Sequence, residues 1–187
     1  MKAGVRALGV AESYRGDRST LAGAVVRADR VVDGVGFGTC TIGGRDATTA
    51  VISIFRQLGR EDVRYLLVAG IAPAWYNLLD LHEIADAVDR PVLSVSFEDS
   101  PGLEAALREA FDGDALDARL GIYRAQPPRR QVTVNGETVF VRAVGVDEGE
   151  AVDVVRAFTP EGGRPEPLRV ARIAARAADE TFVSGDA

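Results

Sequence analysis

The chain has 187 residues, of which 47% are hydrophobic, and a formal net charge of −6. These values predict a single domain spanning residues 1–187 and argue against strong, diffuse binding to nucleic acid. The single cysteine, Cys40, excludes an intrachain disulfide and a CxxC metal site. No apolar run approaches the ~20 residues that span a bilayer, and residues 1–10 lack the apolar core of a signal peptide. We therefore expect no membrane partner and a cytoplasmic location.

The first third of the chain predicts three strands separated by short turns, which is typical of an antiparallel meander. The strand patterns cover residues 6–14, 19–29 and 30–43, and the first turn is the polar segment 15–19. A helix over residues 48–59 follows, with Asp46 or Thr48 as its N-cap and Gly59 at its end.

The remainder alternates strands with helices. Continuously apolar runs predict buried strands over 63–72 and 90–98. Helices are predicted over 78–89, 101–113, 147–159 and 165–180, and a hairpin over 130–145 turns at Asn135-Gly136. The apolar stripe predicted for the last helix consists of Val170, Ile173, Ala174 and Ala177. This element order predicts an α/β fold with a mixed sheet covered by helices.

The segment "VAGIAPAWYNLLDL", residues 68–81, carries an aromatic loop after a buried strand. Loops at the carboxyl ends of central strands are where α/β folds place ligands, so Trp75 or Tyr76 is a candidate for stacking on a base. The alternative is that both rings pack over the sheet edge. Asp80 is interpreted as a helix cap before it is considered a catalytic group.

Arginines gather in two places. Arg124, Arg129 and Arg130 surround a Pro-Pro loop, which predicts either a contact with a nucleic-acid backbone or an exposed connection. Arg169, Arg172 and Arg176 form a row on the last helix, which is either a phosphate-facing row or a solvated face. His82, the only histidine, has no spaced partner, so hydrolysis with a histidine base is not expected.

Four segments, "LGVAESY", "GGRDATTAV", "VAGIAPAWYNLLDL" and "RPEPLRVARIAA", resemble the archaeal endonuclease dU family in their order and spacing. That family is related to endonuclease V, a DNA-repair-type hydrolase. The resemblance implies an RNase H-like fold, with an antiparallel three-strand meander and parallel strands flanked by helices. It also implies metal-dependent phosphodiester hydrolysis, with Mg²⁺ or Mn²⁺ held by carboxylates.

The positions implied by the resemblance depart from that chemistry. The first-strand aspartate falls at Ala11, the acidic residue before the glycine at the end of the fourth strand falls at Ala69, and the helix histidine falls at Arg172. Glu12 follows Ala11, so it faces the opposite side of a strand, and Asp46 matches a family acidic position. We expect Arg172, together with Arg169, to pair with Glu12 or Asp46.

Three functions remain open. The favoured one is a catalytically degenerate protein that binds nucleic acid, DNA rather than RNA. Its predicted contacts are Trp75, Tyr76, Asn77, Arg124, Arg129, Arg130, Arg169 and Arg172. The second is an active endonuclease on uracil- or inosine-containing DNA, with Glu12, Asp46 and Asp80 as a rearranged catalytic site and Glu12 and Asp46 as metal ligands. The third is a protein-interaction subunit that uses the aromatic loop.

Overall fold

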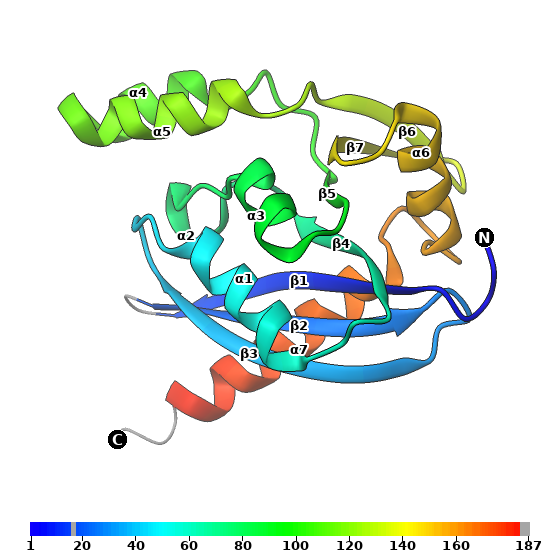
Figure 1. The fold of residues 1–187 in the computed structure, drawn as a ribbon. Coiled ribbons are helices and arrows are strands. Elements are labelled where there is room, and N and C mark those ends of the chain that lie inside the picture. The colour runs from blue at the N-terminus through cyan, green and yellow to red at the C-terminus, as the bar shows by residue number, and fades with distance from the viewer. Residues whose placement is uncertain (16–17, 184–187) are drawn as a thin grey trace.

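The computed structural model describes residues 1–15 and 18–183. In this part of the chain a seven-stranded sheet runs in the order β3-β2-β1-β4-β5-β7-β6 (Figure 1). The strands are β1 Arg6–Arg15, β2 Arg18–Arg27, β3 Val32–Thr41, β4 Val63–Ala69, β5 Val92–Ser96, β6 Arg130–Val134 and β7 Glu137–Val144. Residues 16 and 17 of the predicted first turn lie outside the described residues.

The strand directions give the sheet its mixed character. β1, β2 and β3 pair antiparallel, which confirms the predicted meander. β4 pairs parallel with both β1 and β5, and the β6–β7 hairpin adds antiparallel strands beyond β5. The hairpin turns at Asn135 and Gly136, both with positive φ, as a two-residue Asn-Gly turn requires.

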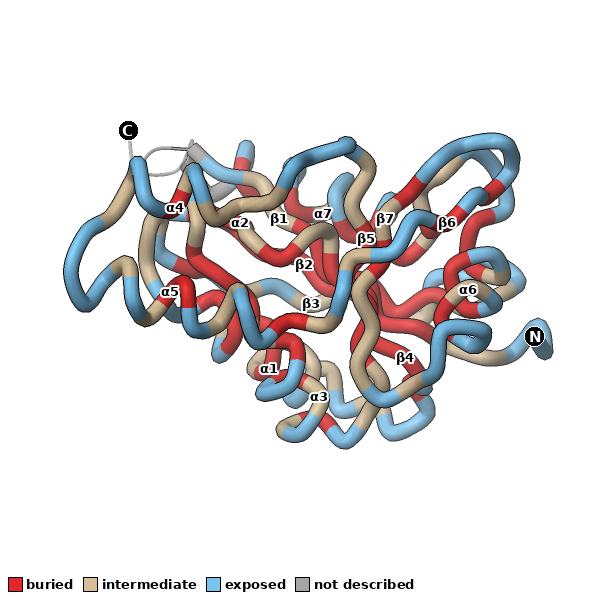
Figure 2. Tube along the Cα trace, turned by 90° about the horizontal axis from the view of Figure 1, so that it is seen from above, coloured by how far each residue is buried: buried red, intermediate tan, exposed pale blue. Residues whose placement is uncertain are grey.

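Helices cover both faces of the sheet (Figure 1). They are α1 Ala47–Leu58, α2 Pro73–Tyr76, α3 Leu81–Val88, α4 Glu104–Ala110, α5 Gly113–Ala125, α6 Glu148–Ala157 and α7 Glu166–Val183. One core cluster joins the sheet to α1 and α3, and another joins it to α6 and the start of α7. Figure 2 shows the buried residues along the central strands, with α4 and α5 at one end and β6 and α6 at the other.

Three helices differ from the sequence prediction. The helix predicted over 101–113 is the shorter α4, and neither α5 nor the short α2 was predicted. The buried side chains of α5 are Arg119 and Leu120 alone, so the segment lacks the apolar stripe by which helices are recognised.

The predicted apolar stripe of α7 is wrong. Its buried residues include Leu168, Ala171, Ala175 and Ala178, whereas Ile173 is 56% exposed. The sheet under α7 presents small residues, and a Cβ added at Gly9 would lie 2.3 Å from the carbonyl carbon of Pro167. Because the helix lies so close to β1, alanines fit this face better than branched side chains.

No helix in the described residues is both long and apolar enough to cross a membrane.

Candidate functional site

β1 presents Ala11 and Glu12 to opposite faces of the sheet. Ala11 is 5% exposed and packs with Ala171 of α7 and with Ala69 at the end of β4. Glu12 lies on the α1 side, as the alternation of a strand requires. The three alanines therefore fill the place where the family resemblance puts two carboxylates.

Little open space lies beside Glu12 on the α1 side of the sheet. The cavity lined by Val10, Glu12, Val51 and Pro73 has a volume of about 10 Å³. A cavity of this size holds one water molecule at most.

The Glu12 carboxylate is engaged by the protein itself. Its Oε2 atom accepts hydrogen bonds from Ser19 Oγ at 2.6 Å and from the backbone N–H of Ala74 at 2.8 Å. Glu12 thus joins β1 to β2 and to the aromatic loop that follows β4.

Asp46 occupies the N-cap position of α1, but its side chain makes no capping bond. Its carboxylate instead accepts from Thr41 N at 3.1 Å, Thr41 Oγ1 at 2.9 Å and Asn77 Nδ2 at 2.6 Å. Burial opposes ionisation, yet the bonds from Asn77 and Thr41 hold the pKa of Asp46 below its usual value.

Cys40 lies near both of these carboxylates. Burial and the negative charges of Asp46 and Glu12 raise the pKa of its thiol to about 12, against the weaker effect of a bond with Ser19. The thiol is therefore protonated at neutral pH and is a poor metal ligand and nucleophile.

Asp80 caps α3, as interpreted from the sequence. Its Oδ1 atom accepts from His82 N at 3.0 Å and Glu83 N at 3.1 Å.

The carboxylates as arranged do not fit a divalent metal ion. In the described residues, no three His, Cys, Asp or Glu side chains are grouped to hold one. A magnesium site needs convergent oxygen ligands, whereas Glu12 and Asp46 are each satisfied by protein donors.

The expected pairing of Arg172 or Arg169 with these carboxylates is wrong. Arg169 pairs with Glu166, at 2.5 Å between Nη2 and Oε1. Arg172 is exposed and lies near Arg164, whose pKa is lowered first by burial and then by repulsion from Arg172. α7 packs on the face of the sheet that carries Ala11, opposite the face on which Glu12 lies.

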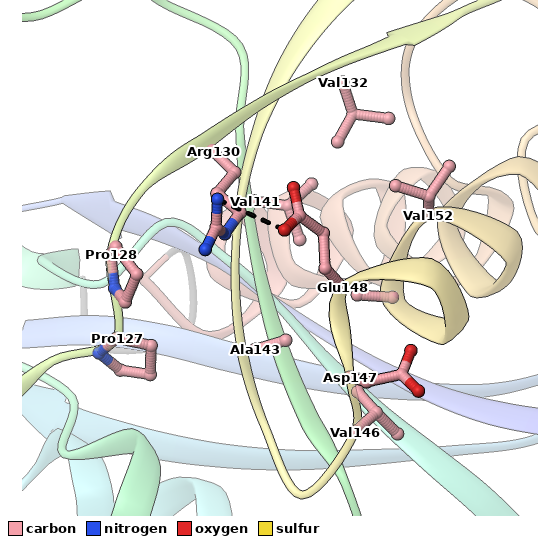
Figure 3. Close-up of a pocket in the computed structure, with 11 residues that line it drawn as sticks. Pro127, Pro128, Arg130, Val132, Val141, Ala143, Val146, Asp147, Glu148 and Val152 are labelled. Atoms are coloured by element: carbon pink, nitrogen blue, oxygen red, sulfur yellow. Dashed lines mark ion pairs between the residues drawn. The ribbon is translucent and has the colours of Figure 1, made fainter.

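Two arginines of the Pro-Pro region are neutralised by carboxylates. Arg124 Nη2 lies 2.6 Å from Glu104 Oε1. Arg130 lies in a pocket of about 210 Å³ between the β6–β7 hairpin and α6, where its Nη1 is 3.2 Å from Glu148 Oε2 (Figure 3). Neither adds unpaired positive charge to the surface.

Arg129 lines a different pocket, which we call the arginine pocket. It has a volume of about 230 Å³ and lies at the carboxyl ends of β4 and β5. Arg129 stacks on Phe140, 3.9 Å from the ring centroid, and donates to the carbonyls of Glu98 and Ser100 and to Ser96 Oγ.

Arg142 of β7 lines the same pocket and was not predicted as a site residue. It lies 5.7 Å from the centroid of Tyr123 and donates to the carbonyl of Pro127. Burial lowers the pKa of Arg142, and repulsion from Arg129 adds to this. Among the described residues neither arginine has an ion-pair partner, although Glu98 lines the pocket rim.

The aromatic loop, residues 70–77, carries three residues that were predicted to contact nucleic acid, and they differ in exposure. Trp75 is 56% exposed, and Tyr76 is half-buried. Asn77 is fully buried: it donates to Thr41 O and Asp46 Oδ1 and accepts from Ala47 N. Asn77 therefore holds the loop in place and does not face a ligand.

Arg119 of α5 was also not predicted as a site residue. The signal that could have indicated its burial is its place beside Leu120 on the inner side of the helix. Arg119 is 4% exposed and donates to the carbonyls of Gly43, Gly44 and Tyr76. It thereby fastens the β3–α1 connection, the aromatic loop and α5 together.

The sheet order and the helices on both faces define an α/β fold of the RNase H-like class. Solved structures are similar to this chain across most of its length. Human ENDOV has a TM-score of 0.63 at 14% identity, covering 95% of this chain and 85% of that one. The endonuclease V of Ciona intestinalis, in complex with a DNA containing an inosine, has a TM-score of 0.63 at 11% identity over 95% and 86% of the two chains.

Sequence comparison identifies the family within this class. Residues 3–179 match the endonuclease dU family. A "UPF0215 protein" of Pyrobaculum aerophilum is 34% identical over 175 residues, covering 91% of this chain and 92% of the relative. A protein of unknown function from Archaeoglobus fulgidus has a TM-score of 0.82 at 24% identity, covering 92% and 97%. The chain belongs to the endonuclease dU family.

Proposed function

We propose that this chain binds nucleic acid, DNA in preference to RNA, and does not perform metal-dependent cleavage. The observation that carries the proposal is the contact among Ala11, Ala69 and Ala171. Methyl groups there supply no oxygen ligand, and Mg²⁺ or Mn²⁺ needs several.

A rearranged site made from the remaining carboxylates is disfavoured. Glu12, Asp46 and Asp80 each accept hydrogen bonds from the protein, and their donors lie in the aromatic loop, at the end of β3 and in the first turn of α3. Recruiting these carboxylates as metal ligands would break those hydrogen bonds.

The binding half of the proposal is supported by the arginine pocket. Arg129 and Arg142 bring two guanidinium charges together beside Phe140 and Tyr123. A phosphate would relieve their mutual repulsion, and the aromatic rings offer apolar contact to a base. The volume of about 230 Å³ is below the ~300–1,000 Å³ of drug-sized ligand sites, so a single base or phosphate fits.

The location of the pocket agrees with this use. It opens at the carboxyl ends of two parallel strands, where ligands of α/β sheets bind. The inosine-containing DNA bound by the similar Ciona protein supports DNA as the partner class.

The test is fluorescence anisotropy with a labelled single-stranded DNA, with and without an inosine, at several salt concentrations. We expect binding that weakens with salt and an affinity loss of roughly tenfold for Arg129→Gln and for Arg142→Gln. Each variant should also lower the salt dependence by about one counterion.

Arg56→Gln is the matched control, because Arg56 is an exposed arginine on α1 that does not line the pocket. Its affinity should equal that of the wild type. Absence of DNA binding by the folded wild type would contradict the proposal, as would equal losses for all three variants.

A further inference from the structure

The aromatic loop has an unusual backbone. Three consecutive residues other than glycine have left-handed φ angles: 48° at Ala74, 54° at Trp75 and 63° at Tyr76. Such residues persist only where surrounding contacts hold them, and they gather at functional sites.

The loop is held at both ends of this strained turn. Ala74 donates to Glu12 Oε2 at 2.8 Å, and its carbonyl accepts from Gly43 N at 2.7 Å. The Tyr76 carbonyl accepts from Arg119 Nε at 3.1 Å. These bonds fix the backbone on either side of Trp75.

The result is an indole that is anchored and exposed. Trp75 packs 5.4 Å from the Phe111 centroid and against Gly43, where an added Cβ would lie 3.0 Å from Cε3. It nevertheless keeps 56% of its surface exposed. An apolar side chain held rigidly in solvent is expected where a flat partner stacks on it.

Positive charge lies beside this indole. Arg119 stacks 3.8 Å from the Phe111 centroid, and within the described residues its hydrogen bonds go to carbonyl oxygens and not to a carboxylate. Arg45 is exposed and close enough to Arg119 to repel it. Both line a shallow hollow of about 380 Å³, together with Gly43, Gly44 and Asp114.

We propose that Trp75 stacks on an unpaired base of a single-stranded nucleic acid whose adjacent phosphate occupies the hollow beside Arg45 and Arg119. Glu12 is the positioning residue that holds the Trp75 backbone. A hollow lined by two arginines and one aspartate beside the aromatic loop, in a chain of net charge −6, favours an anionic aromatic partner over an apolar protein surface. The inference rests on the proposed function and adds a second contact, apart from the arginine pocket.

Trp75 is the only tryptophan of the chain, so intrinsic fluorescence excited at 295 nm reports on this loop alone. Titration with an unlabelled 12-nucleotide oligo(dT) should quench the fluorescence along the same saturation curve that anisotropy gives for the labelled strand. A blunt DNA duplex of the same length should quench weakly.

Different variants test the stacking of Trp75, the charge of the hollow and the positioning role of Glu12. Trp75→Leu should lower the affinity for oligo(dT) by roughly tenfold. Arg45→Ala should weaken binding severalfold and lower its salt dependence, whereas Asp114→Asn should strengthen binding.

Glu12 is tested by a pair of variants. Glu12→Gln keeps an oxygen that accepts from Ser19 Oγ and Ala74 N, so it should retain affinity and quenching. Glu12→Ala should lower affinity and increase quenching of free Trp75 by acrylamide, because the loop is released. Circular dichroism confirms that each variant is folded; if Glu12→Ala does not fold, Ser19→Ala, which removes one of the two donors, takes its place.

Three results would overturn this inference. The first is binding by anisotropy without a fluorescence change, the second is quenching by the duplex as strong as that by the single strand, and the third is a loss of affinity in Glu12→Gln as large as that in Glu12→Ala. The first two leave the proposed function intact, whereas a wild type that binds no oligonucleotide in either assay contradicts the proposed function itself.

Discussion

Asn77 shows how one buried side chain organises the surface around it. Its amide bonds to Ala47 N, Thr41 O and Asp46 Oδ1 at 3.0, 2.9 and 2.6 Å, and none of it is exposed. Removal leaves buried polar groups without partners, which costs more than the bonds themselves contribute.

We predict that Asn77→Ala lowers the free energy of unfolding by roughly 2–3 kcal/mol, measured by urea denaturation. Gln131→Ala removes an exposed amide and should change the free energy of unfolding by less than ~0.5 kcal/mol. Equal stability of the two variants would show that Asn77 does not hold the loops.

Cys40 gives a chemical test at the same scale. With its pKa raised to about 12, mainly by burial, the thiol should react with a disulfide reagent at pH 8 only slowly in the native protein. The rate should rise by orders of magnitude in 8 M urea. Rapid stoichiometric labelling of folded protein would contradict the environment described for Cys40.

The sequence predicted the residue types of the site better than their contacts. Alternation along β1 indicated that Glu12 faces away from Ala11. Nothing local indicated that Ala74, 62 residues further on, donates to Glu12. The expected Arg172 pairing failed for the same reason, since the rotation of α7 is set by its packing on the sheet.

At the scale of elements, the position of α7 depends on a close approach to β1. A Cβ at Gly9 would lie 2.3 Å from the Pro167 carbonyl carbon and 2.4 Å from its oxygen, and neither backbone atom can rotate away. The whole helix would have to move.

Gly9→Ala should therefore lower the free energy of unfolding by at least about 2 kcal/mol, measured by urea denaturation. The control is Gly121→Ala in α5, where nothing lies within 4 Å of an added Cβ. It should raise the free energy of unfolding by roughly 0.5–1 kcal/mol, because alanine favours a helix. A neutral Gly9→Ala would mean that α7 lies farther from β1.

Elements with strong periodicity or clear turn signals were predictable, including the meander, the β6–β7 hairpin, α1 and α3. α5 was not, because its inner face carries Arg119, whose bonds to four carbonyls replace apolar packing. The buried face of α7 was predicted wrongly, because the small residues of the sheet opposite the helix leave room for alanines and not for Ile173.

At the scale of the whole molecule, hydrogen bonds to carboxylates set the response to acid. Bonds from Arg124 and Arg108 lower the pKa of Glu104 from 4.5 to about 2, and bonds from Asn77 and Thr41 outweigh burial at Asp46. A carboxyl whose pKa is lower in the folded state stabilises the fold above its unfolded pKa. That contribution is lost as pH falls through the folded value.

The melting temperature should consequently fall between about pH 4.5 and pH 2, followed by circular dichroism. Asp46→Asn should flatten part of this fall. Glu104 is exposed, so solvent screening makes its share small. A melting temperature that is constant or rises toward pH 2 would contradict this assignment.

We propose that this chain retains the fold of an endonuclease while alanines stand at the positions where the family resemblance places metal ligands. The most direct test is incubation of the purified protein with end-labelled DNA containing inosine or uracil, in Mg²⁺ and in Mn²⁺, with products resolved on a denaturing gel. We predict intact DNA with either metal, under conditions where the protein binds the strand. Metal-dependent nicking that Glu12→Gln abolishes would show that a carboxylate site survives and would contradict the account.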